Sequence, residues 1–110
     1  MTKNYLVMFS LLIISSCNQI DIDNDAPACI RTKIKAFSKE SCKDGAVKEY
    51  SFQDATVYLF EPGTCGADMT AEVLDSNCNT IGHLGGIIGN TIINEEDFSN
   101  AESLKTIWER

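Results

Sequence analysis

The side chains best suited to chemistry in this chain are three oxygen donors at alternate positions, Asp75, Asn77 and Asn79. In a tight turn this spacing directs the oxygens at one centre, as in the opening of a calcium-binding loop. The rest of such a loop is not matched, because position six is Thr80 instead of glycine and position twelve is Gly86 instead of glutamate. The same residues also favour an ordinary turn in which Asx side chains bind their own backbone. Calcium is therefore the one cofactor that the sequence suggests, and otherwise none is expected.

A cluster of glycines surrounds His83, the only histidine of the chain. No Lys-Ser or Lys-Thr pair follows these glycines and the next charged residues are acidic, which argues against a phosphate-binding loop. Glycine adopts positive φ angles readily, so the segment suits either close backbone packing or a ligand-binding loop. We predict that it forms a binding surface together with the Pro-Gly turn at residues 62–68. The expected ligand-binding residues are Pro62, Gly63, Thr64, Asp68, His83, Gly85, Gly86, Gly89 and Asn90.

Four cysteines, Cys29, Cys42, Cys65 and Cys78, follow the apolar start of the chain. They contain no C-x-x-C pair and only one histidine accompanies them, so a zinc site is disfavoured. An even number of cysteines in a small exported domain indicates disulfides, which stabilise a small core. Four cysteines allow three pairings. We favour Cys29–Cys42 and Cys65–Cys78, because each pair joins neighbouring elements over a short span.

The fifth cysteine, Cys17, ends a segment typical of a secretory signal. Lys3 supplies one positive charge, and residues 5–14 are almost all apolar. This run is shorter than the roughly 20 residues needed to span a bilayer. Residues 14–17 read Ile-Ser-Ser-Cys and resemble a bacterial lipobox. The resemblance implies cleavage after Ser16, attachment of diacylglycerol to the Cys17 sulfur, and acylation by a fatty acid such as palmitate at the new amino group.

A lipidated Cys17 would place the protein in the bacterial cell envelope. Two or more acyl chains hold a protein stably on a membrane, and the outer membrane is the favoured location. The alternative is an ordinary cleaved signal in which Cys17 is incidental. The expected organisation is a signal peptide at residues 1–16, the lipidated cysteine and a flexible acidic tether at residues 17–28, and a single small domain at residues 29–110.

Charge is unevenly distributed along the chain. The net charge is −7, and it becomes −8 when Lys3 leaves with the signal peptide. Residues 29–48 carry six basic and two acidic side chains, whereas the chain after Lys48 carries two basic and eleven acidic ones. So acidic a chain is not expected to bind nucleic acid. The basic segment is interpreted as the solvated face of a helix, with contact to an anionic surface or a glycan as the alternative.

The periodicity of the apolar residues predicts an α+β fold, a small antiparallel sheet flanked by an N-terminal and a C-terminal helix and stapled by disulfides. Ile30, Ile34 and Phe37 recur at helical spacing after Pro27. Residues 47–52 and 56–60 are β-rich and predict a hairpin, and residues 69–74 predict a third strand. At the end of the chain, Ser99 and Glu102 match a helix capping box. One face of the helix expected to follow would carry Ala101, Leu104, Ile107 and Trp108.

Four segments resemble an uncharacterised family of small bacterial lipoproteins. They are residues 29–35 (CIRTKIK), 57–60 (VYLF), 65–68 (CGAD) and 84–89 (LGGIIG). The family similarly joins a Cys-Ile-x-x-x-Ile helix to a Val-Tyr strand, a cysteine turn and a Gly-Gly-Ile-x-Gly loop. Its members often carry a doubled cysteine at the turn, where Cys65 stands alone here. The resemblance supports the fold and implies no activity.

We predict a lipid-anchored, non-enzymatic binding or interaction module, whose partners are the membrane and a protein or glycan ligand. No catalytic motif is recognised, since a Cys–His pair needs a free thiolate and no serine lies in a G-x-S-x-G motif. One alternative is a structural module stabilised by calcium at Asp75, Asn77 and Asn79. Another is a small enzyme acting on envelope polymers, which would need His83 beside carboxylates.

Overall fold

The computed structural model describes residues 21–66 and 69–110, so Cys17 and Asp68 lie outside the described residues. A five-stranded antiparallel sheet has the order β4-β3-β2-β1-β7, and β5 and β6 form a second, two-stranded sheet. The described ranges contain no helix that is both long and apolar enough to cross a membrane. The elements are α1 (Ala28–Glu40), β1 (Ala46–Phe52), β2 (Ala55–Glu61), β3 (Thr70–Asp75), β4 (Thr80–Gly85), β5 (Ile92–Ile93), β6 (Glu96–Asp97), a 3-10 helix (Phe98–Asn100) and β7 (Glu102–Glu109).

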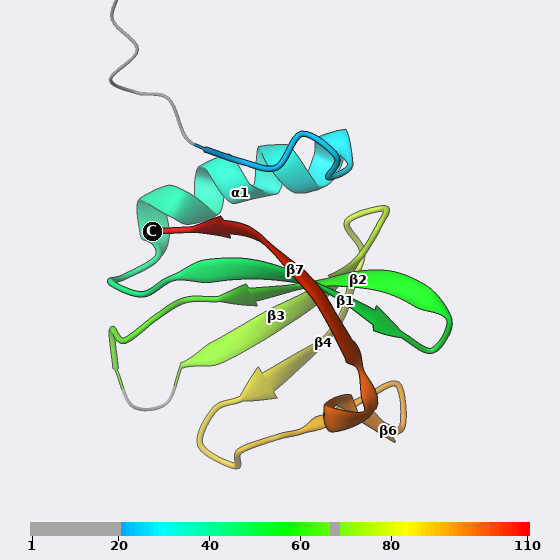
Figure 1. Cartoon of the computed structure of the whole chain (residues 1–110). Coiled ribbons are helices and arrows are strands. Elements are labelled where there is room, and N and C mark those ends of the chain that lie inside the picture. The colour runs from blue at the N-terminus through cyan, green and yellow to red at the C-terminus, as the bar shows by residue number, and fades with distance from the viewer. Residues whose placement is uncertain (1–20, 67–68) are drawn as a thin grey trace, which may run out of the picture.

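The helix packs on one face of the sheet. Ile30 and Ile34, which recur one helical turn apart, are 0% exposed. These isoleucines pack on sheet residues that point toward α1, while the strand residues between them point to the other face. The sheet residues on the α1 side are Val47, Tyr58, Phe60, Leu74 and Trp108. Figure 1 shows α1 lying along the sheet as a separate layer.

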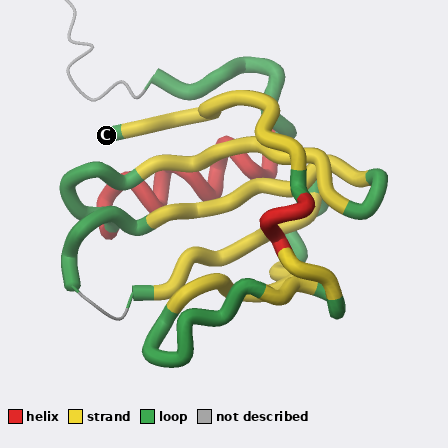
Figure 2. Tube along the Cα trace, turned by 60° about the horizontal axis from the view of Figure 1, so that its bottom comes forward, coloured by secondary structure: helices red, strands yellow, loops and turns green. Residues whose placement is uncertain are grey.

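The segment between β4 and β7 covers part of the opposite face of the sheet (Figure 2). Ile93 lies over Gly82 of β4, where a Cβ atom would collide with the Ile93 side chain. Phe98 packs against Phe52 with the rings tilted, and the ring centroids are 5.0 Å apart. The central strand β2 is therefore buried on both faces, which explains its unbroken apolar run. This second core contains Phe52, Val57, Leu59, Val73, Ile93 and Phe98.

The predicted hairpin and third strand are confirmed. β1 and β2 pair from Ala46 opposite Glu61 to Phe52 opposite Ala55. The two residues between them, Gln53 and Asp54, have φ angles of 53° and 61°. Positive φ at both positions is the conformation of a type I′ turn, whose twist matches that of the strands it joins.

The C-terminal helix predicted from residue 99 is wrong, because this segment forms a short 3-10 helix followed by strand β7. The cap residue is Asp97, whose carboxylate accepts a hydrogen bond from the Ser99 amide at 2.8 Å. Two register shifts against β1 leave Leu104 and Ile107 as extra residues of β7. Each such β-bulge adds one residue to the strand, so apolar side chains recur at intervals of three, as they would in a helix.

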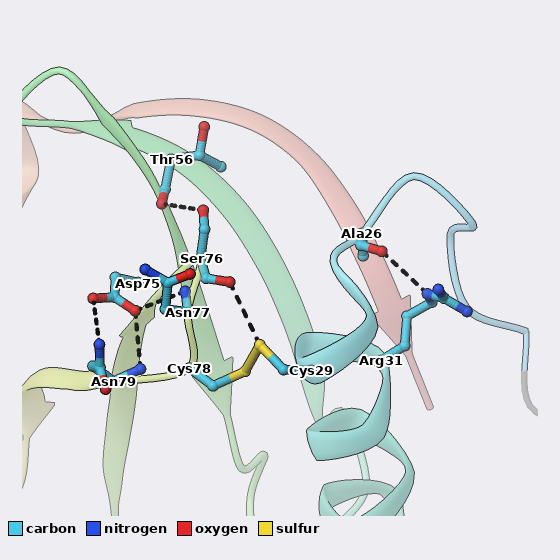
Figure 3. The surroundings of a disulfide bond; sticks show 9 residues. All are labelled: Ala26, Cys29, Arg31, Thr56, Asp75, Ser76, Asn77, Cys78 and Asn79. Carbon is cyan, nitrogen blue, oxygen red and sulfur yellow. Dashed lines mark hydrogen bonds between the residues drawn. A yellow bond between two sulfur atoms is a disulfide. The ribbon is translucent and has the colours of Figure 1, made fainter.

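The expected disulfide pairing is also wrong. The structure pairs Cys29 with Cys78, with Cα atoms 6.2 Å apart, and Cys42 with Cys65, with Cα atoms 5.4 Å apart. Cys29 and Cys42 lie at opposite ends of α1, whose 13 residues hold them about 20 Å apart. Strand β3 separates Cys65 from Cys78 in the same way. Figure 3 shows how the first bridge ties the start of α1 to the turn between β3 and β4.

The acidic segment before the helix was expected to be a tether as far as residue 28, but most of it is part of the domain. Ile22 packs against the core beneath α1, and Ala26 is 4% exposed. The Asp23 amide donates to the Ile107 carbonyl at 3.1 Å, and the Asp23 carboxylate lies 3.0 Å from Lys105 Nζ. A tether can therefore include only residues that precede Ile22.

Candidate functional site

An open groove of about 480 Å³ lies on the sheet face opposite α1, beyond the part that residues 91–101 cover. Its floor consists of Leu59 of β2, Ala71 of β3 and Leu84 of β4. Ala71 and Leu84 are directly opposite each other in the β3–β4 ladder, so both side chains point to this face. Ala71 and Leu84 are partly exposed and Leu59 is 5% exposed, so the described chain leaves this apolar part of the sheet partly accessible.

One wall of the groove is the turn after β2, which includes Pro62, Gly63 and Thr64. Backbone hydrogen bonds hold this turn against the segment after α1, from the Cys42 amide to the Pro62 carbonyl at 2.8 Å and from the Thr64 amide to the Lys43 carbonyl at 3.0 Å. Gly63 has a φ of +93°, and a Cβ atom there would collide with the backbone of Lys43. Glycine is therefore required for the turn to dock in this position.

Charged groups stand at the same rim. The Glu61 carboxylate lies 3.1 Å from Lys48 Nζ, across the β1–β2 pair. The hydrogen bond that Lys48 donates to this carboxylate raises the pKa of Lys48 above its ordinary value. Asp44 also lines the groove, and its side chain makes no ion pair with a described residue. The rim thus offers one carboxylate that is available to a cationic ligand.

The loop from Gly85 to Asn90 stands beside the other wall. The Gly85 and Asn90 amides each donate to the carbonyl of the other residue, at 2.8 and 3.0 Å. The Asn90 side chain also donates to the His83 carbonyl at 2.7 Å. At the tip, Ile87 and Ile88 are 85% and 86% exposed. The loop therefore holds two large apolar side chains in solvent on a well-bonded base.

The two segments predicted to bind ligand come together at one end of the sheet. Gly86 donates its amide to the Met69 carbonyl at 3.2 Å, and Met69 lines the groove together with Pro62. Strand β3, which begins at Thr70, lies between β2 and β4, so the segment after β2 and the segment after β4 meet at the same end of the sheet. Asp68 lies outside the described residues. The isoleucines at the loop tip were not among the predicted site residues, although their position between glycines was visible in the sequence.

A family model described as a domain of unknown function (DUF6970) matches residues 32–110. The chain belongs to this family. No curated protein and no solved structure matches it. Within the DUF6970 domain lie the groove, the loop of residues 85–90 and three of the four paired cysteines, while Cys29 precedes the matched residues.

His83 of the DUF6970 domain is exposed and sits on β4 opposite Glu72. The two residues form no ion pair, and His83 is one position away from the groove residue Leu84 on a strand whose side chains alternate between faces. The histidine side chain therefore lies outside the groove, and only its carbonyl supports the loop.

The three candidate calcium ligands lie in the turn between β3 and β4 (Figure 3). The Asp75 carboxylate accepts hydrogen bonds from the Asn77 and Asn79 amides, both at 2.9 Å, and from the Asn79 side chain at 3.2 Å. The Asn79 amide is the main cause of the lowered pKa of Asp75. Among the described residues no group of three His, Cys, Asp or Glu side chains is placed to hold a metal ion. The arrangement is that of the ordinary Asx turn.

A second groove of about 330 Å³ was not anticipated from the sequence. It lies between β1, the end of β4 and the 3-10 helix, and it shares Leu84 with the first groove. Its one partly exposed aromatic strand residue, Tyr50, makes an edge-to-face contact with Phe98, with ring centroids 5.1 Å apart. The alternation of Tyr50 with its neighbours on β1 was the available signal, but which face remained open depended on the position of residues 91–101.

Proposed function

We propose that this chain is a lipid-anchored protein of the bacterial cell envelope that binds an extended segment of a protein partner with the groove and the neighbouring loop. The observation that carries the proposal is the pair Ile87 and Ile88, which are 85% and 86% exposed beside an apolar groove. Exposed apolar patches on small proteins commonly mark interaction sites. A loop held by paired backbone hydrogen bonds would lose little entropy when it binds.

The chemistry of the groove favours a polypeptide that carries apolar and basic side chains. The apolar floor of Leu59, Ala71 and Leu84 fits alternate side chains of an extended segment. The Asp44 carboxylate at the rim makes no ion pair with a described residue, so it favours a cationic residue next to them. The net charge of −7 would also attract a basic partner.

A glycan is the less favoured ligand. Sugar rings stack on exposed aromatic faces, whereas the described residues that line the larger groove include no aromatic side chain. Tyr58 and Phe60 of the sheet are both 3% exposed and are covered by α1. These two aromatic side chains are therefore used for packing, and the partly exposed Tyr50 lies in the second groove.

Two features support the envelope location and the lipid anchor. Residues 14–17 match the lipobox pattern at each position. The described cysteines pair into two disulfides, which persist in an oxidising compartment outside the cytosol. We therefore infer that Cys17 carries the lipid.

Intact-mass spectrometry of the protein purified from membranes should give the mass of a chain that starts at Cys17 with acyl groups added. An unprocessed N-terminus would contradict the anchor.

Binding is tested by peptide selection against the native protein in detergent. We expect enrichment of extended peptides in which apolar residues alternate and a Lys or Arg lies beside them. The double variant Ile87→Ser/Ile88→Ser and the variant Leu84→Gln should each abolish the enrichment. The matched control is Leu104→Ser on β7 at the opposite edge of the sheet, where an exposed apolar residue is also removed. Enrichment that survives the Ile87 and Ile88 changes, or selection of peptides without such a pattern, would overturn the proposal.

A further inference from the structure

The outer surface of α1 is basic although the molecule is acidic. Lys35 and Lys39 lie one helical turn apart on the side opposite the buried Ile30 and Ile34, and Lys43 follows just after the helix. All three lysines are exposed, and none forms an ion pair with a described residue. Together, Lys35, Lys39 and Lys43 form a basic face. Lysines without an ionic partner form a patch of positive potential that attracts anionic surfaces.

The acidic residues nearby are directed elsewhere. Glu40 lines a small hollow together with Lys33 and Glu72, between α1 and β3. Asp44 lines the groove on the opposite face of the sheet. Near the start of the described chain, Asp23 and Asp25 lie 3.0 and 3.7 Å from Lys105 Nζ. Glu40 and Asp44 therefore offset only part of the positive charge, because residues 29–48 carry six basic and two acidic side chains.

The chain length between Cys17 and the domain limits how the domain can sit. Ile22 is packed against the core, so only residues 18–21 separate it from Cys17. Even when fully extended, this connection spans about 18 Å. A domain of this size is about 30 Å across. The side that carries Ile22 must therefore stay near any membrane in which the Cys17 lipid is embedded.

The described chain begins on the same side of the sheet as α1, whereas β5, β6 and the loop of residues 85–90 lie on the other side (Figure 1). We propose that the basic face docks on anionic phospholipid headgroups of the membrane that holds the lipid anchor. This inference depends on the proposed lipidation of Cys17. The docked domain directs Ile87 and Ile88 away from the membrane, where a protein partner can reach them.

The attraction between the basic face and the headgroups is electrostatic. One lysine near an anionic membrane surface favours the bound state by about fivefold. The effect falls off over about 8 Å at physiological ionic strength. The lipid anchor keeps the basic face within reach of the headgroups, so even this modest attraction is enough to orient the domain.

The test is lysine footprinting of the native lipidated protein in nanodiscs. The discs contain phosphatidylcholine either alone or with phosphatidylglycerol. Because about fivefold per lysine compounds over three lysines, we expect acetylation of Lys35, Lys39 and Lys43 to be on the order of 100-fold slower in the anionic discs, and high salt should abolish the difference. Lys48 pairs with Glu61 and lies opposite Leu59 on the sheet face away from α1, so it is the internal reference and should react equally in both kinds of disc.

A double variant distinguishes docking of the whole basic face from separate effects of the anionic lipid on the reactivity of each lysine. Lys35→Gln/Lys39→Gln should remove most of the protection of Lys43, which is itself unchanged. Intact mass reports the lipid independently, so equal acetylation of a lipidated protein in both discs would overturn the docking and leave the anchor standing. Hydroxyl-radical footprinting that finds Ile87 and Ile88 protected by discs would also overturn it, because the domain would then be inverted. Neither result depends on the peptide selection, which tests the groove separately.

Discussion

Three aspartates fold the chain locally by the same device. Asp23, Asp75 and Asp97 each accept a hydrogen bond from the backbone amide two residues further on, at 2.8, 2.9 and 2.8 Å. Hydrogen bonds from backbone amides stabilise the ionised carboxylate, so the pKa of each aspartate is lowered. Each turn is thus linked to the ionisation of one carboxyl group.

This linkage predicts acid sensitivity. A carboxyl group with a lowered pKa in the folded state stabilises the fold above its ordinary pKa of 3.8 and loses this contribution as the pH falls through the folded value. We expect the midpoint of thermal unfolding to stay level from neutral pH to about pH 5 and to fall below about pH 4. Asp75→Asn keeps an acceptor for the amides but does not titrate, so its acid slope should be shallower than that of the wild type. An identical slope would show that Asp75 does not contribute.

A second prediction at the scale of one residue concerns the stability effect of replacing Gly63. Its φ of +93° and the nearby backbone of Lys43 leave no room for a side chain. Gly63→Ala should lower the free energy of unfolding by about 2–4 kcal/mol, from backbone strain and overpacking together. Gly66→Ala is the matched control, since nothing lies within 4 Å of a Cβ atom there. Chemical denaturation of both variants provides the comparison, and equal losses would contradict the docked position of the turn.

Strand β7 shows how an element can be misread from its sequence. Ala101, Leu104, Ile107 and Trp108 have the spacing of a helical face. In the structure two bulges produce this spacing, and both Ile107 and Trp108 are buried against α1 although they are neighbours in a strand. Pairing with β1, which is about 55 residues earlier in the chain, decides the conformation. Local periodicity cannot report a pairing partner so distant.

The disulfides join elements that are far apart in the sequence, and each should contribute accordingly. The bridges Cys29–Cys78 and Cys42–Cys65 span 49 and 23 residues. Replacing both cysteines of a bridge by serine should cost about 4 kcal/mol for the first and about 3 kcal/mol for the second. Urea denaturation of each double variant measures the loss. Non-reducing peptide mapping of the wild type should recover these two pairs, and recovery of Cys29 joined to Cys42 would contradict the structure.

The end of β7 is attached to the end of α1. The Arg110 guanidinium donates to the Ser38 and Ser41 carbonyls, which lie at the C-terminus of the helix where negative partial charge accumulates. Arg110→Ala should lower the free energy of unfolding by about 1.5–3 kcal/mol. Arg110→Lys keeps the charge but has fewer donors, so it should recover only part of the loss. Full recovery by lysine would mean that charge alone matters.

The two exposed isoleucines at the tip of the loop of residues 85–90 do not contribute to the stability of the molecule as a whole. Ile87 and Ile88 contribute to neither core cluster and are 85% and 86% exposed. Ile87→Ser/Ile88→Ser should therefore change the free energy of unfolding by less than about 0.5 kcal/mol. Thermal unfolding of this variant beside Leu104→Ser checks the expectation. A large loss for the tip variant would mean that these isoleucines pack against something and are not held for a partner.

The range of the interactions along the chain explains which parts of the candidate site could be predicted from the sequence. The glycine loop and the Pro-Gly turn were recognised because turn chemistry is local. Two features of the groove were not recognised, namely the contact of these segments through Met69 and the apolar floor of Leu59, Ala71 and Leu84. Both depend on the register of β2, β3 and β4. The second groove depends on where residues 91–101 cross the sheet.

From the sequence alone one can derive the helix around Ile30 and Ile34, the hairpin of β1 and β2, the strand β3 and the uneven distribution of charge, because each depends on residues close together in the chain. Only the tertiary structure decided that the C-terminal segment is a strand, which cysteines pair, that the chain from Ile22 onward belongs to the domain and which sheet face stays open. These features arise from contacts between residues tens of positions apart. Such contacts outweigh local preference once they bury apolar surface, and no short stretch of sequence encodes them.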